Sequence, residues 1–379
     1  MELLGKIFSC MLLAGVIVAG CGHPPPIIID NADSDCAWNQ GGGDFKRASY
    51  TPLESSDIAG LLWTRDFKKR LTVEPTAAYG RILVPTTDRR LFVISSTDGS
   101  RLAVKKYKKV IVAPAVVSDS LAVLLVDGEK LIIENWISHQ TLWEADLGGS
   151  FIEPLVMDGK VYWIDGKNLL RCYRLEDGVR IWDRKLDNHY SCTVTGSSAG
   201  VFLACDQGII YCYETNSGQT KWIYDSGDRM RNPPVIAGDQ LVFCCTEGKV
   251  GRLNAADGSP VWKTDLKSPI IAPPASDGQG VYLGTNDRYI YRLDFDSGDV
   301  IWRRKIGGPV KAGPTLTENL AIFVSIDYRA YFVDKNSGKI LYRYETDGML
   351  TTRPLVCDGK VLIAGEDRKL YCFDIAGEE

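Results

Sequence analysis

Residues 296–302 read Asp-Ser-Gly-Asp-Val-Ile-Trp, a polar turn followed by the start of an apolar strand. Forty residues earlier the chain reads Ala-Asp-Gly-Ser-Pro-Val-Trp at 256–262, and another 40 residues earlier it reads Asn-Ser-Gly-Gln-Thr-Lys-Trp at 216–222. A constant period of about 40 residues is typical of supersecondary units that repeat in a stack or a ring. The stretch is therefore one copy of a repeat, and the spacing of its copies predicts the fold.

Three columns of residues keep this period along most of the chain. The tryptophan column reads Trp63, Ala103, Trp143, Trp182, Trp222, Trp262, Trp302 and Tyr342. Four residues before each of these, the turn column reads Ala59, Gly99, His139, Gly178, Gly218, Gly258, Gly298 and Gly338. A third column reads Pro75, Pro114, Pro154, Val194, Pro234, Pro274, Pro314 and Pro354. Eight copies of one unit are therefore expected.

Each unit has the pattern of four short antiparallel strands. Residues 274–302 alternate apolar and polar side chains in segments that break at the turns 277–280, 286–288 and 296–299. No unit has convincing helical spacing. Four strands per unit, repeated eight times, predict an all-β, eight-bladed β-propeller of four-stranded antiparallel blades. Seven blades are the alternative, in which the degenerate unit between Ala103 and Trp143 is misread.

The two ends of the repeat predict how the ring closes. The last unit stops at residues 375–377, before any outer strand, whereas the first tryptophan, in the segment 58–63, has no inner strands ahead of it. We expect the N-terminal strand to complete the last blade, because this pairing removes the free edges of an open sheet.

The tryptophan and turn columns have a structural interpretation. A turn glycine such as Gly298 adopts positive φ without steric cost. The large ring four residues later can fill the space between neighbouring blades, and a bound cofactor would not need such a ring in every blade. We therefore predict that Trp63, Trp143, Trp182, Trp222, Trp262, Trp302 and Tyr342 pack between blades, with tight turns at Gly99, Gly178, Gly218, Gly258, Gly298 and Gly338.

The N-terminus has the pattern of an export signal. Lys6 precedes the uncharged apolar stretch 7–19, which is too short to span a bilayer as a helix, and Val18-Ala19-Gly20-Cys21 follows. This segment resembles the lipobox of bacterial lipoproteins, in which Cys21 would carry the lipid; an ordinary signal peptide beside a chance cysteine is the alternative. We predict a signal peptide at 1–20, a lipidated cysteine and flexible tether at 21–56, and the propeller at 57–379.

Charge and cysteine content limit the function classes. The net charge of −4 and the pI near 5.6 provide no global basic field, so no nucleic-acid partner is expected. Nine of the 11 cysteines remain after Cys10 in the leader and Cys21 are set aside. One cross-strand disulfide among Cys192, Cys205 and Cys212 is possible, although buried free thiols explain most of them as well.

No motif predicts a catalytic or metal site. The three histidines, His23, His139 and His189, have no paired spacing of the kind that binds zinc. Acidic residues recur before hairpin bends, at Asp88, Asp206, Asp287 and Asp367, which is the pattern of turn chemistry. Neither a nucleophile elbow nor a phosphate-binding glycine loop is present. We therefore predict no catalytic residue, no metal and no cofactor.

The repeat with Gly-x-x-x-Trp once per unit resembles the PQQ-like repeat of quinoprotein-type propellers, over residues 58–379. Together with the lipobox and the closure pattern, it resembles the BamB family, the lipoprotein subunits of the outer-membrane barrel-assembly machinery. This resemblance implies a non-enzymatic scaffold, anchored by lipid to the outer membrane and facing the periplasm, that works as a monomer within that complex. The connection 186–191 departs from the family, since it is short and lacks the arginine of the family's partner loop.

Two other function classes stay open. A PQQ-dependent quinoprotein dehydrogenase would need a bound quinone, and the adjacent Cys244 and Cys245 resemble the vicinal pair of those enzymes, although the regular spacing leaves no room for their long insertions. A ligand-binding or sensing envelope propeller would need a central funnel lined with aromatic residues.

One surface is predicted to bind a partner. The turns between second and third strands and the connections between blades should lie on one face, and they are rich in lysine and arginine. The candidate residues for partner binding are Arg229, Arg231, Arg288, Arg329 and Arg353. The alternative is a mixed rim in which these arginines pair with neighbouring aspartates.

Overall fold

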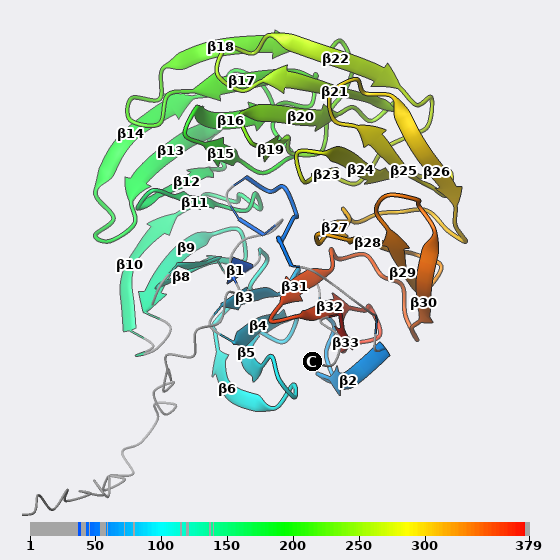
Figure 1. Ribbon diagram of the computed structural model, residues 1–379. Helices are drawn as coiled ribbons and strands as arrows, with labels where there is room; N and C mark the ends of the chain where they lie inside the picture. The colour runs from blue at the N-terminus through cyan, green and yellow to red at the C-terminus, as the bar shows by residue number, and fades with distance from the viewer. Residues whose placement is uncertain are drawn as a thin grey trace, which may run out of the picture.

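The structure is a computed structural model, and eight antiparallel sheets in it form a closed ring (Figure 1). It describes residues 37–38, 43–44, 46–53, 58, 60–71, 73–78, 80–113, 116–118, 121–135, 138 and 140–375. Each sheet is one blade, which we number 1 to 8 from β3 onward. The prediction of eight four-stranded blades is confirmed, with β1 as an additional fifth strand inside β3 of blade 1, and the degenerate unit forms the complete blade 2.

Every blade runs from a short inner strand to an exposed outer strand. The innermost strands are β3 (Thr76–Ala78), β7 (Val116–Ser118), β11 (Leu155–Met157), β15 (Thr195–Ser197), β19 (Val235–Ala237), β23 (Ala275–Ser276), β27 (Thr315–Leu316) and β31 (Leu355–Cys357). The second strands are β4 (Arg81–Thr86), β8 (Leu121–Val126), β12 (Lys160–Ile164), β16 (Gly200–Ala204), β20 (Gln240–Cys244), β24 (Gly280–Gly284), β28 (Leu320–Ser325) and β32 (Lys360–Ala364). The third strands are β5 (Arg90–Ser95), β9 (Lys130–Asn135), β13 (Leu169–Arg174), β17 (Ile209–Tyr213), β21 (Lys249–Asn254), β25 (Tyr289–Asp294), β29 (Arg329–Asp334) and β33 (Lys369–Asp374). The outer strands are β6 (Arg101–Lys106), β10 (Gln140–Asp146), β14 (Arg180–Lys185), β18 (Thr220–Asp225), β22 (Pro260–Asp265), β26 (Val300–Lys305), β30 (Ile340–Glu345) and β2 (Gly60–Asp66).

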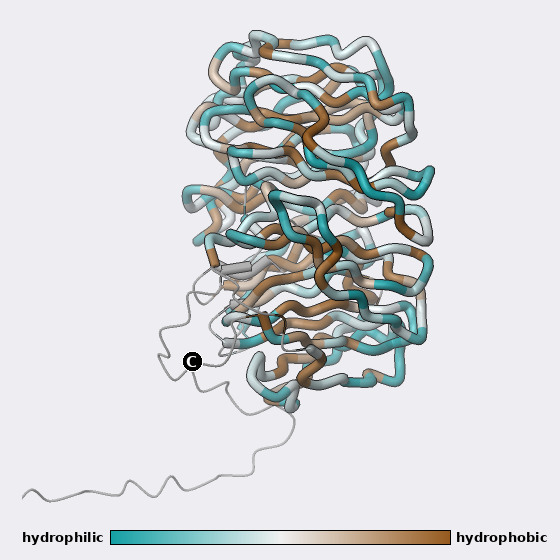
Figure 2. The backbone as a smooth tube through the Cα atoms, turned by 45° about the vertical axis from the view of Figure 1, so that its right-hand side comes forward, coloured by the Kyte–Doolittle hydropathy of each residue, from teal (hydrophilic) through white to brown (hydrophobic). Residues whose placement is uncertain are grey.

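Burial follows the position of a strand in its blade. All residues of second strands such as β16 and β24 are buried, because both faces of the sheet pack against neighbouring blades. Outer strands such as β30 alternate between half-buried and exposed residues. Figure 2 shows the same distribution, with hydrophobic strands inside the ring and mostly hydrophilic loops at its edges.

The N-terminal strand closes the ring, as predicted. β2 pairs antiparallel with β33, from Gly60 opposite Asp374 to Asp66 opposite Lys369. The last blade therefore combines three strands from the C-terminal end of the repeat with one from its beginning.

Each tryptophan of the column binds the following blade. Trp222 lies in blade 4, and its indole N–H donates a hydrogen bond of 3.0 Å to the carbonyl of Ala255 in blade 5. Its ring also lies against Gly258, where a Cβ atom would be 2.7 Å from two ring carbons. The same pair of contacts recurs at Trp63, Trp143, Trp182, Trp262 and Trp302. The turn glycine is therefore required both for its positive φ and for the space that the neighbouring ring occupies.

The contact changes where the sequence departs from the repeat. Tyr342 lies between blades 7 and 8, with its ring centroid 5.6 Å from Phe332 and 6.5 Å from Phe373. Ala103 packs against an aliphatic cluster with Leu83 and Leu124 instead of providing a ring. The turn position that would follow Ala103 is His139, outside the described residues.

Part of the segment predicted to be a flexible tether is bound inside the ring. Strand β1 (Ala37–Trp38) pairs with β3, and residues 46–53 form backbone hydrogen bonds with the inner edges of blades 5, 6 and 7. The low hydrophobicity and glycine content of residues 21–56 suggested a tether, but from residue 46 to residue 53 the backbone finds partners on the propeller. Residues 46–53 are therefore bound to the propeller and do not form part of a flexible tether.

The predicted signal peptide and Cys21 lie outside the described residues. No helix in the described part of the chain is long and apolar enough to cross a membrane.

Substituting Gly258 with alanine should destabilise the protein more than the same change at Gly238. Both glycines have positive φ, +74° and +63°, but only the Cβ atom at Gly258 would meet the Trp222 ring. We expect G238A to lower the free energy of unfolding by about 1–2 kcal/mol, because alanine disfavours the backbone conformation. G258A should lower it by about 1–3 kcal/mol more, because the added methyl group overpacks the contact with the ring. Denaturant unfolding of both variants measures the difference; equal losses would show that the ring contact imposes no constraint.

Candidate functional site

The connections between blades and the hairpins between second and third strands lie on one side of the ring, here called the connection face. Each connection bonds to a hairpin on either side of it: the Ile306 N–H donates to the Arg288 carbonyl at 2.9 Å, and the Asn286 N–H donates to the Pro269 carbonyl at 2.9 Å. The same pattern recurs at Leu266 with Gly248 and at Thr246 with Arg229. These bonds fix the loops of this face to one another, so the face is a rigid surface.

Around the centre of the connection face, one exposed side chain projects from each connection of blades 3 to 7. These residues follow a buried residue of the connection, and they are Phe151, Ser191, Arg231, Ile271 and Lys311. Phe151 is 64% exposed and Ile271 is 39% exposed. Two cations and two apolar side chains therefore lie in one arc, which suits a partner surface with both acidic and apolar groups.

Three predicted arginines are available on this face. Arg229 and Arg231, in the connection to blade 5, and Arg288, in the hairpin of blade 6, are exposed and form no ion pair within the described ranges. Arg288 has a φ of 74°, a backbone region where the matching positions of blades 4 and 5 carry Gly208 and Gly248. Since positive φ is costly for a residue with a Cβ atom, backbone preference does not explain arginine there.

The other two predicted arginines are not available. Arg329 is held by the Glu345 carboxylate at 2.7 Å, as in the mixed-rim alternative. Arg353 is only 8% exposed and lies against Gly313 in the centre of the ring, so its predicted exposure is corrected. It directly precedes Pro354 and an inner strand, the place that Glu153 holds in blade 3, and Glu153 is buried as well. Burial lowers the pKa of its guanidinium.

Many remaining cations of the connection face are neutralised locally. Arg90 pairs with Asp88, Arg70 with Glu366, and Lys369 with Asp347. The connection face is therefore not uniformly basic. Among the described residues, exposed cations that form no ion pair lie over blades 4 to 7, at Arg229, Arg231, Arg288 and Lys311, and also over the other blades, at Lys69, Arg89, Lys108, Lys167 and Arg368.

A cleft of about 460 Å³ adjoins this region, between the connections 149–152 and 187–190. Phe151 and Ile152 line one side, and His189 and Tyr190 line the other. His189 Nδ1 lies 2.9 Å from Asp206 Oδ2, and the Ser191 hydroxyl donates to Asp206 Oδ1. Burial acts to raise the pKa of Asp206, but the bonds from Ser191 and His189 outweigh it and hold the pKa below its usual value. Asp206 therefore stays ionised and fixes His189 at the edge of the cleft.

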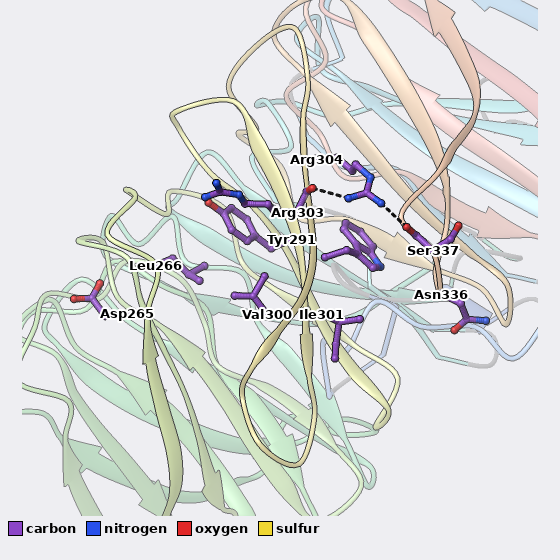
Figure 3. A pocket seen from close by; sticks show the side chains of 10 residues that line it. Asp265, Leu266, Tyr291, Val300, Ile301, Arg303, Arg304, Asn336 and Ser337 are labelled. Carbon is purple, nitrogen blue, oxygen red and sulfur yellow. Dashed lines mark hydrogen bonds between the residues drawn. The ribbon is translucent and has the colours of Figure 1, made fainter.

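A second groove, of about 630 Å³, lies on the outer rim beside β26 (Figure 3). Val300 and Ile301 are exposed there, and the Arg304 guanidinium donates to the carbonyls of Arg303 and Ser337 at 2.9 and 2.6 Å. An exposed apolar residue precedes the tryptophan column in most outer strands, so this groove is one part of a rim-wide feature and not a distinct site.

The cysteines do not form the arrangement of a quinone site. The seven free thiols are all buried, at Cys172, Cys192, Cys205, Cys212, Cys244, Cys245 and Cys372. The cross-strand disulfide considered among Cys192, Cys205 and Cys212 is not formed, and the adjacent Cys244 and Cys245 are not joined. Cys357 is disulfide-bonded. In the described ranges no group of three or more acidic, histidine or cysteine side chains could hold a metal ion.

The ring of four-stranded blades, closed by its N-terminal strand and held by the Trp–Gly contact, defines the protein as a β-propeller of PQQ-like repeats. A family model described as "Outer membrane protein assembly factor BamB" matches residues 206–306 and 246–379. BamB of Salmonella typhimurium strain LT2 is 24% identical over 121 residues, which are 28% of this chain and 31% of that protein. The chain thus matches about a third of the length of this curated relative. It is a BamB-like propeller.

Solved structures share the fold. BamB from Moraxella catarrhalis aligns with a TM-score of 0.69 at 14% identity, covering 84% of this chain and all of that one. A europium-containing methanol dehydrogenase aligns with a TM-score of 0.73 at 12% identity, covering 89% and 98%. At such identities these likenesses show the fold alone.

Sequence reasoning missed the apolar half of the site. Phe151 and Ile271 look like strand-forming residues of the repeat, and only their place after a buried residue of a connection marks them as exposed. The available signal was the variability of that column, which changes from Phe to Ser, Arg, Ile and Lys between units. A buried position would not tolerate such a change.

We expect the free thiols to resist alkylation in the folded protein. Burial raises the pKa of Cys192 and Cys244 to about 12 and has the same effect on Cys172, Cys212 and Cys372. We treat the protein with iodoacetamide at pH 8, without reductant, and count the labels by intact mass. The seven free cysteines should take up no label in the folded protein and seven labels after denaturation. Native labelling of Cys244 or Cys245 would contradict their burial.

Proposed function

We propose that this protein is a non-enzymatic scaffold lipoprotein of the bacterial envelope, a BamB-like factor in outer-membrane protein assembly. The observation that carries the proposal is the rigid arc of unpaired cations and exposed apolar side chains on the connection face, from Phe151 to Lys311. Side chains of these two kinds, held on a fixed surface, suit protein docking. The BamB-like repeats support the barrel-assembly complex as the partner.

The proposal includes the anchor and the location. Cys21, at the end of the lipobox-like segment, would carry the lipid, so that the propeller faces the periplasm from the outer membrane as a monomer within a complex. The residue after it is Gly22, and the resemblance to enteric lipoproteins with no aspartate at that position favours the outer membrane.

The dehydrogenase alternative gains no support from the described residues. The dehydrogenase likeness is at 12% identity and concerns the fold. The vicinal cysteines are separate buried thiols, and the inner edges of three blades are occupied by residues 46–53 of the chain.

Replacing Arg229 and Arg231 with alanine should weaken capture of the partner. Each exposed charge contributes on the order of 1 kcal/mol or less, so the pair should lower affinity by about tenfold, with a reduced salt dependence. The measurement is a pull-down of the lipidated protein from its native membrane in mild detergent, with mass spectrometry of barrel-assembly subunits.

The matched control removes Lys305 and Lys339, two exposed lysines of the outer rim, and should leave capture unchanged. Arg288→Gly is a further variant that should weaken capture without loss of stability, because glycine relieves the positive φ. If the Arg229/Arg231 variant still recovers the partner at wild-type yield, the connection face is not the docking surface. Failure of the wild type to recover any assembly subunit would remove the assembly role.

Replacing Cys21 with serine should release the protein from the membrane. Without the thioether-linked lipid the propeller has only weak membrane affinity, so most of it should move from the membrane pellet to the soluble periplasmic fraction. Fractionation and the mass of the N-terminal peptide measure this. Retention in the membrane with an unlipidated wild-type N-terminus would show that another element anchors the chain.

A further inference from the structure

The segment 46–53 runs along the inner edges of three consecutive blades (Figure 1). The amide N–H groups of Ile236, Ser276 and Leu316 donate to the carbonyls of Lys46, Ala48 and Ser49 at 2.9, 3.0 and 2.8 Å. The inner strands therefore do not end in a free edge there. They continue through the backbone of the N-terminal segment, which forms a parallel bridge to Leu316 at Tyr50.

The Arg47 side chain extends the contact to two further blades, 3 and 4. Its Nε atom donates to the Val194 carbonyl of blade 4 at 2.8 Å, and an Nη atom lies 3.0 Å from the Glu153 carboxylate of blade 3. The Arg47 and Glu153 side chains are 3% and 10% exposed. A buried charge left without its partner is strongly unfavourable, so this pair holds the segment in place.

Tyr50 attaches the other end of the segment. Its hydroxyl donates to the Glu318 carboxylate, and the Lys335 ammonium lies 5.4 Å from the centre of its ring. Lys335 is itself buried against Asp277, at 2.6 Å, in the neighbouring blade 6. The segment thus joins a polar network that already links blades 6 and 7.

The backbone of the segment is held against its own preference. Arg47 and Ser49 have φ angles of 55° and 57°. Positive φ is unfavourable for such residues and persists only where surrounding contacts impose it. The surrounding inner strands, and not the local sequence, therefore set this conformation.

The N-terminal side of the segment is attached as well. β1 pairs with β3 of blade 1, and it also lies beside β31 of blade 8. Together, these attachments reach seven of the eight blades.

We propose that residues 46–53 are an intramolecular ligand of the central channel, the space that the inner strands surround, with Arg47 as its anchoring residue. They tie together blades that the ring alone links only to immediate neighbours, and they keep other extended peptides away from the inner edges of blades 5 to 7. The inference does not depend on the partner under the proposed function, because it rests only on contacts within this chain.

Arg47→Ala in the full chain tests the tying role. Loss of the buried pair should release the segment and speed hydrogen exchange at the amides of Ile236, Ser276 and Leu316 by about 100-fold or more, while second strands such as β16 stay protected. Hydrogen exchange read by mass spectrometry resolves these inner strands. The matched control, Arg180→Ala, breaks the exposed pair with Asp183 on β14 and should leave the three amides unchanged.

Tyr50→Phe provides a second test if the Arg47 variant folds poorly. It removes one hydrogen bond at the end of the segment and keeps the ring on Lys335, so faster exchange should be confined to the amides of Leu316 and Glu318, which bond to Ser49 and Leu53. Unchanged exchange at these amides in both variants would overturn the tying role.

A peptide added in trans tests the blocking role. A fluorescent peptide with the sequence of residues 43–53 should bind the Arg47→Ala protein, whose channel has lost its occupant, and should not bind the wild type. The Arg47→Ala/Glu153→Gln double variant should bind it at least tenfold more weakly, because the negative charge that pairs with the peptide's arginine is gone. Equal binding to wild type and variant, or none to the variant despite faster exchange, would overturn the role of the segment as the channel's ligand.

Discussion

The fold depends on one contact between successive blades, an indole ring of one blade set against a turn glycine of the next. The ring provides apolar area and one hydrogen bond, and the glycine provides a place for it that no other residue leaves free. Because Trp63 of the N-terminal strand makes this contact with Gly99 of blade 1, the same interaction also crosses the seam where the ring closes. The closure is thus fixed by the pairing of β2 with β33 within blade 8 and by the packing of the Trp63 indole against blade 1.

This contact explains why the sequence predicted the fold so fully. A column that must be kept in nearly every blade leaves a period that can be read from one chain, and Trp262 and Trp302 mark it without any structure. The same logic explains the misses. Residues 46–53 belong to no repeat, so their partners on the inner strands have no counterpart in the period. Arg353 was placed on the surface because the repeat shows which residues are equivalent, but not whether the space at the ring centre is filled.

The functional positions are those at which the units differ. Most positions of the structural columns are glycine, proline or tryptophan, whereas the exposed column carries a different residue in each unit: Phe151, Ser191, Arg231, Ile271 and Lys311. A ring of near-identical blades has no intrinsic direction in its plane, and a partner can recognise one sector only through such differences. This exposed column, with its mixture of cations and apolar side chains, therefore marks one sector of the connection face, over blades 3 to 7.

The N-terminal segment gives the ring a second kind of asymmetry. Each blade of the ring packs through its faces against its two immediate neighbours. Separating one pair of blades therefore opens the ring, and no contact between distant blades opposes this separation. Residues 46–53 contact blades 5, 6 and 7 by backbone and blades 3 and 4 through Arg47, so they couple blades that do not touch. Strand β1, which precedes this segment in the chain, pairs with β3 and so adds blade 1 to the coupled set. The coupling therefore lies along the inner strands of the ring, whereas the Trp–Gly contacts that join immediate neighbours lie at the outer strands.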